Sequence, residues 1–305
     1  MKNVLVTGIT GFVGYRLGQE LHKRGYNVVG IVRDVHKNQK LDFADIVYGN
    51  IIKTDLVQRT VVDYDIDTIF HLAAQSIVSR AEKNPVETFK INAIGTVNVL
   101  EVCRKFNIKC LFTSTDKVYG PTIKATEQSP LIPTNVYATS KIAADLTAQM
   151  YMKNYSSQVI ITRACNIYGP GDTNPRIIPN TIRACLEGKS PIIFTDIVGE
   201  REYIYVDDVV DAYITLAEKQ RHGIFNIGTG FVKRQTEVVF AILKYFEGIK
   251  PEYVRKGGVE LIPSQSLDST RIHTLVGWHH KVSFAEGIKR TVEWWRKAKS
   301  ITSDD

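Results

Sequence analysis

The chain has 305 residues, of which 44% are hydrophobic and 23% are charged, and its formal net charge at pH 7 is +7. This length allows one large domain or two unequal domains that share a cleft, and the composition is that of a globular protein. No apolar run is long enough to span a bilayer, and lysine and arginine are spread along the chain without the dense basic cluster typical of nucleic-acid binding.

Short β-branched runs alternate with helical stretches through the first half of the chain. This alternation predicts the α/β class, with a doubly wound parallel sheet of the Rossmann type covered by helices. The predicted strands are 3–7, 27–32, 46–48, 68–71, 109–114 and 158–162, and the predicted helices are 12–24, 86–106 and 137–154.

The alternation of strands and helices becomes less regular after Pro170, Pro175 and Pro179, which indicates that the chain leaves the sheet there. The later part of the chain predicts a smaller, partly discontinuous substrate-binding domain that closes over the carboxyl edge of the sheet, where ligands bind in such folds. We expect residues 1–165 and about 204–228 in the Rossmann domain, and about 166–203 and 229–305 in the smaller one. The helices predicted here are 176–187, 207–219, 235–246 and 284–297, and the strands are 191–194 and 224–227.

A glycine-rich loop, Thr7-Gly8-Ile9-Thr10-Gly11-Phe12-Val13-Gly14, follows the first predicted strand and opens the first helix. Its backbone amides and the positive end of the helix can face a pyrophosphate, which predicts dinucleotide binding rather than a turn without a ligand. At the end of the second strand, Val32 stands where an acid would select NAD, and Arg33 follows it. This favours NADP, while Asp34 keeps NAD open.

Two further stretches indicate a chemistry. Tyr137 and Lys141 lie four residues apart, on one face of a predicted helix, and a cation near a tyrosine can lower its pKa. The phenolate can then take a proton from a sugar-like hydroxyl as hydride leaves the same carbon. The run Thr113-Ser114-Thr115-Asp116-Lys117-Val118-Tyr119-Gly120 adds a hydroxyl, a carboxylate and an amine after an apolar strand. Together the two stretches predict oxidation of an alcohol on a nicotinamide cofactor.

These motifs resemble those of the extended short-chain dehydrogenases/reductases, in the group of nucleotide-sugar epimerases and dehydratases. The resemblance covers nearly the whole chain and implies a nicotinamide cofactor in the N-terminal domain and a nucleoside diphosphate sugar between the domains. Further matching motifs are His71-Leu72-Ala73-Ala74-Gln75-Ser76, Asn92 with Gly95-Thr96, Asn166-Ile167-Tyr168-Gly169-Pro170-Gly171, Arg201-Glu202-Tyr203-Ile204-Tyr205-Val206-Asp207-Asp208-Val209, Phe225-Asn226-Ile227-Gly228 and Val276-Gly277-Trp278.

The same resemblance implies roles for individual residues. Tyr137 would be the base, and Lys141 would bind the nicotinamide ribose. The cofactor would be bound by Gly8, Thr10, Gly11, Phe12, Val13, Gly14, Arg33, Asp34, Asn50, Ile51, Leu72, Ala73, Ala74, Asn92, Thr113, Tyr137, Lys141 and Ala164. The substrate would be bound by Gln75, Ser76, Thr115, Asn166, Arg176, Arg201 and Arg271, since an arginine fork donates two hydrogen bonds at once to a pyrophosphate.

The residues after Thr115 decide between subfamilies. A 4,6-dehydratase needs an acid and a base beside the tyrosine, because it removes a proton from carbon 5 and protonates the leaving hydroxyl at carbon 6. Asp116 would be that acid and Lys117 that base, and Thr-Asp-Lys resembles the CDP-glucose 4,6-dehydratases. We therefore expect a nucleotide-sugar 4,6-dehydratase. A 4-epimerase, or a keto-sugar epimerase or reductase, is the alternative because Val118-Tyr119-Gly120 also occurs in those enzymes. A third possible function is that of a redox-inactive NADP-binding sensor or interaction protein. The presence of Thr115, Tyr137 and Lys141 together argues against this possibility.

The remaining expectations concern partners and location. In the family, helices corresponding to 92–106 and 137–154 often pair across a two-fold axis, so we expect a homodimer built on a four-helix bundle. We expect neither nucleic acid nor a membrane as a partner, and a cofactor that is retained through purification. Apolar residues directly after Met1-Lys2-Asn3 leave no room for a signal peptide, which predicts a cytoplasmic protein. The four cysteines lack metal-type spacing and are expected to be buried free thiols, with no metal site.

Overall fold

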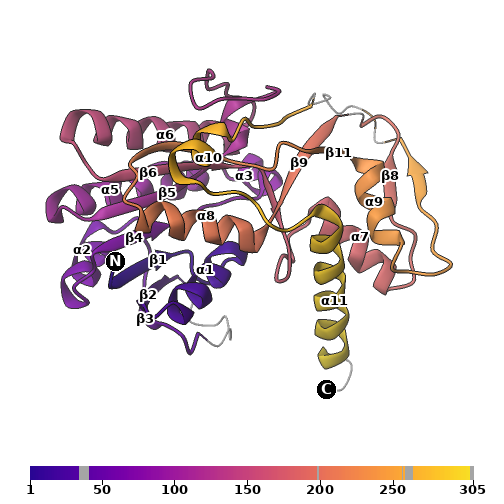
Figure 1. Cartoon of the computed structure of the whole chain (residues 1–305), viewed down its shortest axis with the longest axis horizontal. Helices are drawn as coiled ribbons and strands as arrows, with labels where there is room; N and C mark the ends of the chain where they lie inside the picture. The colour runs from indigo at the N-terminus through magenta and orange to yellow at the C-terminus, as the bar shows by residue number, and fades with distance from the viewer. Residues whose placement is uncertain (34–40, 198, 256, 258–263, 303–305) are drawn as a thin grey trace.

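A seven-stranded parallel sheet forms the larger part of the protein (Figure 1). The computed structural model describes residues 1–33, 41–197, 199–255, 257 and 264–302. The sequence predicts all seven strands, with ends that differ from the observed ones by at most two residues, because each is a short run rich in apolar residues between turns, and all but β3 are mostly buried. In sheet order they are β10 (Gly223–Ile227), β6 (Val159–Ala164), β5 (Lys109–Thr115), β4 (Thr68–His71), β1 (Asn3–Thr7), β2 (Asn27–Val32) and β3 (Asp45–Tyr48).

Helices cover both faces of this sheet, as a doubly wound fold requires. Val4 and Val6 of β1 pack in the core cluster that includes α1 and α8, whereas Leu5 between them packs in the cluster on the other face. This alternation follows from the two-residue period of a strand. The first face carries α1 (Phe12–Lys23) and α8 (Val206–Glu218), and the second carries α2 (Thr54–Asp63), α5 (Gly95–Phe106) and α6 (Val136–Tyr155).

The helix predicted over 86–106 is interrupted. It consists of α4 (Pro85–Phe89), a π-helical turn η1 (Lys90–Ile94) and α5. Asn92 lies in this turn, is 1% exposed and binds Gln75 and Ser140 through its side chain. A π turn inserts one extra residue per turn, and such turns occur often at functional sites. The apolar period alone does not predict it.

The smaller part of the protein combines two short sheets with three helices, seen at the right of Figure 1. Its helices pack together around a core of their own that includes Ile178, Val238 and Ile288. The division into two domains at the predicted residues stays a prediction. The short strands are β7 (Asn166–Tyr168), β9 (Glu200–Tyr205) and β11 (Val232–Arg234) in one sheet and β8 (Ile192–Phe194) and β12 (Glu252–Val254) in the other, and the helices are α7 (Ile177–Leu186), α9 (Gln235–Leu243) and α11 (Phe284–Thr302).

The sequence does not predict α2, and it also does not predict three shorter helical elements. They are α3 (Val78–Lys83), the 3-10 turn η2 (Asp116–Tyr119) and α10 (Thr270–Val276). Each has at most seven residues, too few for a helical period to stand out in the sequence. Among the described residues, none of the helices combines the length and the apolar character needed to cross a membrane.

Candidate active site

A cavity of about 830 Å³ opens at the carboxyl ends of the central strands, between the glycine-rich loop and α6. This is the edge where ligands bind in open parallel sheets. Most of the predicted site residues line it, although they come from many separate segments of the chain. Those that line it are Gly8, Thr10, Gly11, Phe12, Val13, Gly14, Arg33, Asn50, Ile51, Leu72, Ala73, Ala74, Gln75, Ser76, Thr113, Thr115, Asp116, Lys117, Tyr137, Lys141, Ala164, Asn166 and Arg176.

Three predicted residues lie elsewhere. Asn92 sits behind the lining, where it holds the backbone of Gln75 through bonds of 2.7 and 3.1 Å. Arg201 of β9 bonds the carbonyl of the preceding residue at 2.8 Å and is not among the lining residues. Arg271 of α10 lies over the ring of Phe225, beside β10 and away from the cavity, because α10 packs on that edge strand. Asp34 lies outside the described residues.

The glycine-rich loop is shaped for a close approach of a ligand to the backbone. Gly8 has a φ of +75°, and a Cβ on it would lie 2.9 Å from the amide nitrogen of Ala73. A Cβ on Gly14 would lie 2.1 Å from the carbonyl oxygen of Gly8, so only glycine fits there. The Gly11 amide donates to the same oxygen at 2.9 Å, and α1 begins at the next residue. The loop therefore presents a helix N-terminus to the cavity, which fits the pyrophosphate of a dinucleotide.

Lys141 is held deep in the site. It is 3% exposed, its Nζ donates to the carbonyl oxygen of Thr113 at 2.6 Å, and it lies 4.4 Å from the centroid of the Phe112 ring. Burial lowers the pKa of Lys141 to about 8, although the nearby Asp145 carboxylate acts in the opposite direction. An ammonium with this pKa can exchange a proton near neutral pH.

Tyr137 is one turn before Lys141 on α6, whose first turn is capped by Asn135. Burial raises the pKa of Tyr137, while a hydrogen bond with Thr115 acts in the lowering direction. The expected lowering of this pKa by Lys141 is therefore wrong for this structure, because desolvation of the phenolate outweighs the favourable contacts. The hydrogen bond to Thr115 nevertheless joins the two motifs that the sequence singles out.

Thr115, Asp116 and Lys117 form a compact hydrogen-bonded turn at the end of β5. The Thr115 hydroxyl donates to Asp116 at 3.1 Å and accepts from the Lys117 amide at 3.3 Å, which caps η2. Asp116 is 2% exposed, and its Oδ2 accepts from Lys117 Nζ at 3.0 Å. An acid and a base in direct contact, both facing the cavity, can pass one proton between them.

Sequence patterns miss part of the cavity wall. Several of these residues adjoin a predicted motif, so the end of that motif is the signal that could have found them. The missed lining residues are Ile31, Val32, Gly49, Ile77, Val78, Ser79, Arg80, Ile91, Ser114, Cys165, Ile167, Asn174, Pro175 and Tyr213.

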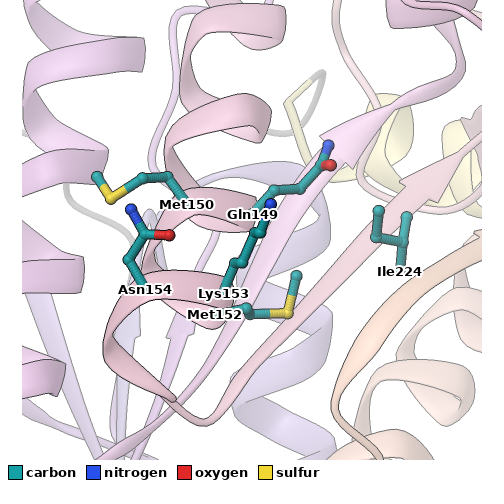
Figure 2. Close-up of a pocket in the computed structure, with 6 residues that line it drawn as sticks. All are labelled: Gln149, Met150, Met152, Lys153, Asn154 and Ile224. Atoms are coloured by element: carbon teal, nitrogen blue, oxygen red, sulfur yellow. The ribbon is translucent and has the colours of Figure 1, made fainter.

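A second pocket lies at the C-terminal end of α6, beside β10 (Figure 2). It contains none of the predicted site residues, and its lining is Gln149, Met150, Met152, Lys153, Asn154 and Ile224. All four cysteines are buried and free, as predicted. Within the described part of the chain, no three His, Cys, Asp or Glu side chains gather in a way that could hold a metal ion.

The sequence of the chain matches a known family. The NAD dependent epimerase/dehydratase family matches residues 4–228, which is more than half of the chain. The chain belongs to this family. Its α/β fold and its glycine-rich loop are thereby placed among NAD-dependent enzymes that act as epimerases or dehydratases.

The curated relatives include both kinds of enzyme. The chain is 30% identical over 322 residues to human dTDP-D-glucose 4,6-dehydratase, covering 97% of this chain and 90% of the relative. It is 32% identical to UDP-glucose 4-epimerase of Mycolicibacterium smegmatis, covering 96% and 98%. A trifunctional UDP-glucose 4,6-dehydratase, epimerase and reductase of Arabidopsis thaliana is 31% identical, and 96% of this chain spans about half (47%) of that relative.

Similar solved structures also include enzymes with both activities. The dTDP-glucose 4,6-dehydratase of Bacillus anthracis, in complex with NAD, superposes with a TM-score of 0.88 at 28% identity and 98% coverage of both chains. UDP-glucose 4-epimerase of Thermotoga maritima, with UDP-glucose, gives 0.86 at 29% identity, with 97% and 99% coverage. Since identities to the two groups are almost equal, the choice between the two reactions depends on the site itself.

Proposed function

We propose that the protein is a nucleotide-sugar 4,6-dehydratase, which converts a nucleoside diphosphate hexose into a 4-keto-6-deoxy product. The observation that carries this proposal is the contact between Asp116 and Lys117 in the cavity, next to Thr115. An oxidation alone needs a hydroxyl, a tyrosine and a lysine, whereas the loss of water needs an additional acid and base.

The first step is oxidation at carbon 4. When bound, a nicotinamide cofactor would supply the hydride chemistry that oxidation at carbon 4 and reduction at carbon 6 require. Tyr137 accepts the proton of the hydroxyl at carbon 4 as a phenolate, a form that the positive charge of a bound oxidised nicotinamide would favour against the effect of burial. Thr115, which is hydrogen-bonded to Tyr137, orients that hydroxyl. Lys141 follows Tyr137 by one helical turn and, with a pKa of about 8, takes part in returning this proton to solvent.

The second step is the loss of water across carbons 5 and 6. The ketone at carbon 4 acidifies the proton on carbon 5, which Lys117 takes as a neutral amine, while a protonated Asp116 gives its proton to the hydroxyl leaving carbon 6. The pair then holds an ammonium and a carboxylate. After exchange with solvent, the Lys117 ammonium returns a proton to carbon 5 as carbon 6 is reduced. The Asp116 carboxylate, 3.0 Å from Lys117 Nζ, then takes up one proton from solvent, which balances the proton that Tyr137 releases, so the full cycle consumes no proton.

For the cofactor, we propose NADP, held tightly enough to survive purification. Arg33 directly follows β2 and lines the cavity, where a guanidinium can pair with a 2′-phosphate. The family itself is NAD-dependent, so the two dinucleotides must be compared directly. If the proposal is correct, Arg33→Ala weakens binding of NADP more than binding of NAD, as measured by calorimetry; an equal effect on both would show that Arg33 does not select the cofactor.

For the substrate, we propose that Asn166 and Arg176 contact the nucleoside diphosphate sugar. Both line the cavity, Asn166 as the first residue of β7 and Arg176 directly before α7. Asn166 is oriented by a bond of 2.8 Å from its Nδ2 to the Glu202 carbonyl, which leaves its Oδ1 to accept from a ligand. CDP-glucose is the first substrate to test, because the Thr-Asp-Lys sequence resembles that of CDP-glucose dehydratases.

A 4-epimerase is the second candidate. In that enzyme Thr115, Tyr137 and Lys141 would do the chemistry, and the Asp116–Lys117 contact would only stabilise η2. The observation that favours it is the 32% identity to a UDP-glucose 4-epimerase that matches this chain over nearly its full length.

We also propose a homodimer built on α5 and α6. These helices pack side by side and present apolar side chains to solvent, since Phe106 of α5 is 40% exposed and Leu146 of α6 is 52% exposed. Light scattering at several concentrations tests this proposal, and a monomer at every concentration would refute it.

The deciding experiment incubates the enzyme with a panel of nucleotide hexoses in heavy water. A dehydratase gives a product that has lost one water and carries deuterium at carbon 5. A 4-epimerase gives an isomer of unchanged mass without that label. Mass spectrometry of the products separates the two outcomes, and the second one would refute the dehydratase.

A further inference from the structure

A short segment from the C-terminal part of the chain contacts the turn formed by Thr115, Asp116 and Lys117, which we call the catalytic turn. We call residues 264–268 the strap. Its Gln265 pairs with Arg201 of β9 in an isolated bridge, and its Leu267 pairs in the same way with Ala125, in the loop after η2. The strap therefore lies between the small sheet and the segment that follows Lys117.

The side chain of Gln265 contacts the turn that carries the acid and the base. Gln265 is 2% exposed, and its Nε2 donates to the carbonyl oxygens of Asp116 at 2.9 Å and Gly120 at 2.8 Å. Its Oε1 accepts from Lys117 Nζ at 2.7 Å. All three polar contacts of the amide are thus made to η2 and its flanking residue.

These contacts determine which way the amide points. An amide nitrogen can only donate, so two carbonyl oxygens on one side require Nε2 to face them. The Oε1 is then directed at Lys117. A flipped amide would place its oxygen against the two carbonyl oxygens and its NH2 group against the Lys117 amine. Because the acceptor is uncharged, it can hold Lys117 both as an ammonium and as a neutral amine, each of which has an N–H to donate.

Without Gln265, the long Lys117 side chain would be held by Asp116 alone. Its side chain is 27% exposed, so water would compete for the ammonium. With both partners, Nζ is fixed between the Asp116 carboxylate and the Gln265 amide. Lysine has four rotatable side-chain bonds, and fixing its end removes most of the freedom that would otherwise be lost in the reaction.

We propose that Gln265 is a positioning residue for the elimination step, which holds the Lys117 amine at the place from which it takes the proton of carbon 5. This inference rests on the proposed dehydratase function. It assigns a role in the chemistry to the C-terminal part of the chain, which lies about 150 residues from the catalytic turn.

The strap is anchored independently of this side chain. The Leu267 amide donates to the buried Glu202 carboxylate at 2.8 Å, and the Ser266 hydroxyl accepts from the Lys124 amide at 2.8 Å. A change at Gln265 alone leaves these contacts in place. Gln265→Met, of similar length and without an amide, therefore removes the bond to Lys117 and the two bonds to the carbonyl oxygens of Asp116 and Gly120, while the strap stays attached.

The test separates the two chemical steps in single turnovers. Absorbance of the reduced cofactor reports oxidation at carbon 4, and deuterium uptake at carbon 5 reports proton removal. We expect Q265M to slow deuterium uptake on the order of 10- to 100-fold, as a misplaced catalytic group does, and oxidation less than about 2-fold. Ser266→Ala is the matched control on the same strap: it removes one anchor, while the backbone bonds of Ser266 to Thr122 and Ala125 and all Gln265 contacts remain, so it should change neither rate. Equal slowing of both steps by Q265M, or no slowing, would overturn the proposal.

A double variant and a chemical measurement make the test complete. If Gln265 acts through Lys117, Q265M should add nothing to the loss that Lys117→Met already causes; a further loss would contradict the proposal. Acylation of Lys117 by an amine-reactive reagent, followed by peptide mass spectrometry, should be several-fold faster in Q265M, with Lys124 as the internal reference. Q265A serves in place of Q265M if the latter does not fold.

These readouts distinguish the failure of one proposal from the failure of the other. If the wild-type enzyme removes no water from any sugar, the dehydratase assignment fails, and unchanged acylation of Lys117 in Q265M would in addition refute the positioning contact. If the wild-type enzyme does remove water and Q265M slows no step selectively, only the inference about Gln265 fails.

Discussion

Asp145 of α6 and Arg163 of β6 form a buried ion pair in which Nη2 and Oδ1 are 2.7 Å apart and the side chains are 0% and 1% exposed. A second bond of 2.9 Å joins Nε to Oδ2, so the contact is bidentate. Asp145 lies one helical turn after Lys141, and Arg163 also donates to the hydroxyl of Tyr119 at 2.8 Å. The pair thus ties α6 to the sheet and to η2.

Breaking this pair should strongly destabilise the protein. Asp145→Asn leaves the Arg163 guanidinium buried without a counter-ion, and removing one partner of a buried pair costs about 3–5 kcal/mol. Urea unfolding measures the loss. The matched control is Asp55→Asn, which breaks an exposed i,i+4 pair with Arg59 on α2 and should leave the unfolding midpoint unchanged within error. Similar midpoints for D145N and D55N would contradict this account.

The glycine-rich loop gives a second prediction, on cofactor binding. A Cβ at Gly14 would lie 2.1 Å from the Gly8 carbonyl oxygen, whereas a Cβ at Gly11 would lie 3.1 Å from that same oxygen. Gly14→Ala must therefore push the loop apart, while Gly11→Ala needs a shift of only a few tenths of an ångström. We expect G14A to abolish dinucleotide binding and G11A to weaken it, as measured by calorimetry. Equal affinities in the two variants would show that loop geometry does not control binding.

Much of this site was predictable from the sequence because its parts are local motifs. The loop at Gly8–Gly14 and the Tyr137–Lys141 pair each follow a strand or begin a helix, and parallel strands bring their carboxyl ends to one edge. Asp116 and Lys117 were predictable as neighbours in the site for the same reason. Neighbouring residues in a motif stay neighbours in the fold.

Contacts between distant segments were not predictable in this way. Gln265 reaches Lys117 across 148 residues and lies in no recognisable pattern, so only the folded chain reveals it. Arg271 shows the opposite case. The family resemblance implied a contact between Arg271 and the substrate, but α10 packs against β10 and places this residue over Phe225. The sequence alone does not show toward which part of the fold an arginine side chain points, because this depends on how its helix packs.

The buried histidine at the end of β4 predicts a sensitivity to acid. His71 bonds the hydroxyls of Thr7 at 2.8 Å and Thr96 at 3.1 Å, and burial, aided by the Lys141 charge, lowers its pKa from 6.5 to about 3. Between pH 6.5 and 3 the unfolded chain binds a proton that the folded chain does not. The free energy of unfolding therefore falls as the pH falls through this window, by about 1.4 kcal/mol per pH unit from this group.

Replacing the histidine should remove that part of the acid sensitivity. His71→Gln is expected to be less stable than wild type at pH 7, because glutamine does not reproduce both hydrogen bonds of the ring. The difference in the free energy of unfolding should then shrink as the pH is lowered from 6.5 toward 4. Urea unfolding at several pH values measures it, and parallel pH curves for the two proteins would show that His71 does not titrate as proposed.

A substitution in the Asp116–Lys117 pair should separate the oxidation of carbon 4 from the loss of water. Lys117→Met removes the amine that is proposed to take the proton of carbon 5, while Tyr137, Thr115 and Lys141 remain. In a dehydratase, this variant should still oxidise carbon 4, so reduced cofactor accumulates, but release of water should fall on the order of 100- to 10,000-fold, the usual contribution of a general base. Tyr137→Phe is the matched control, because it should block oxidation first and leave the cofactor oxidised. Release of water by K117M at the wild-type rate would exclude Lys117 as the base, and the elimination would then require another group in the cavity.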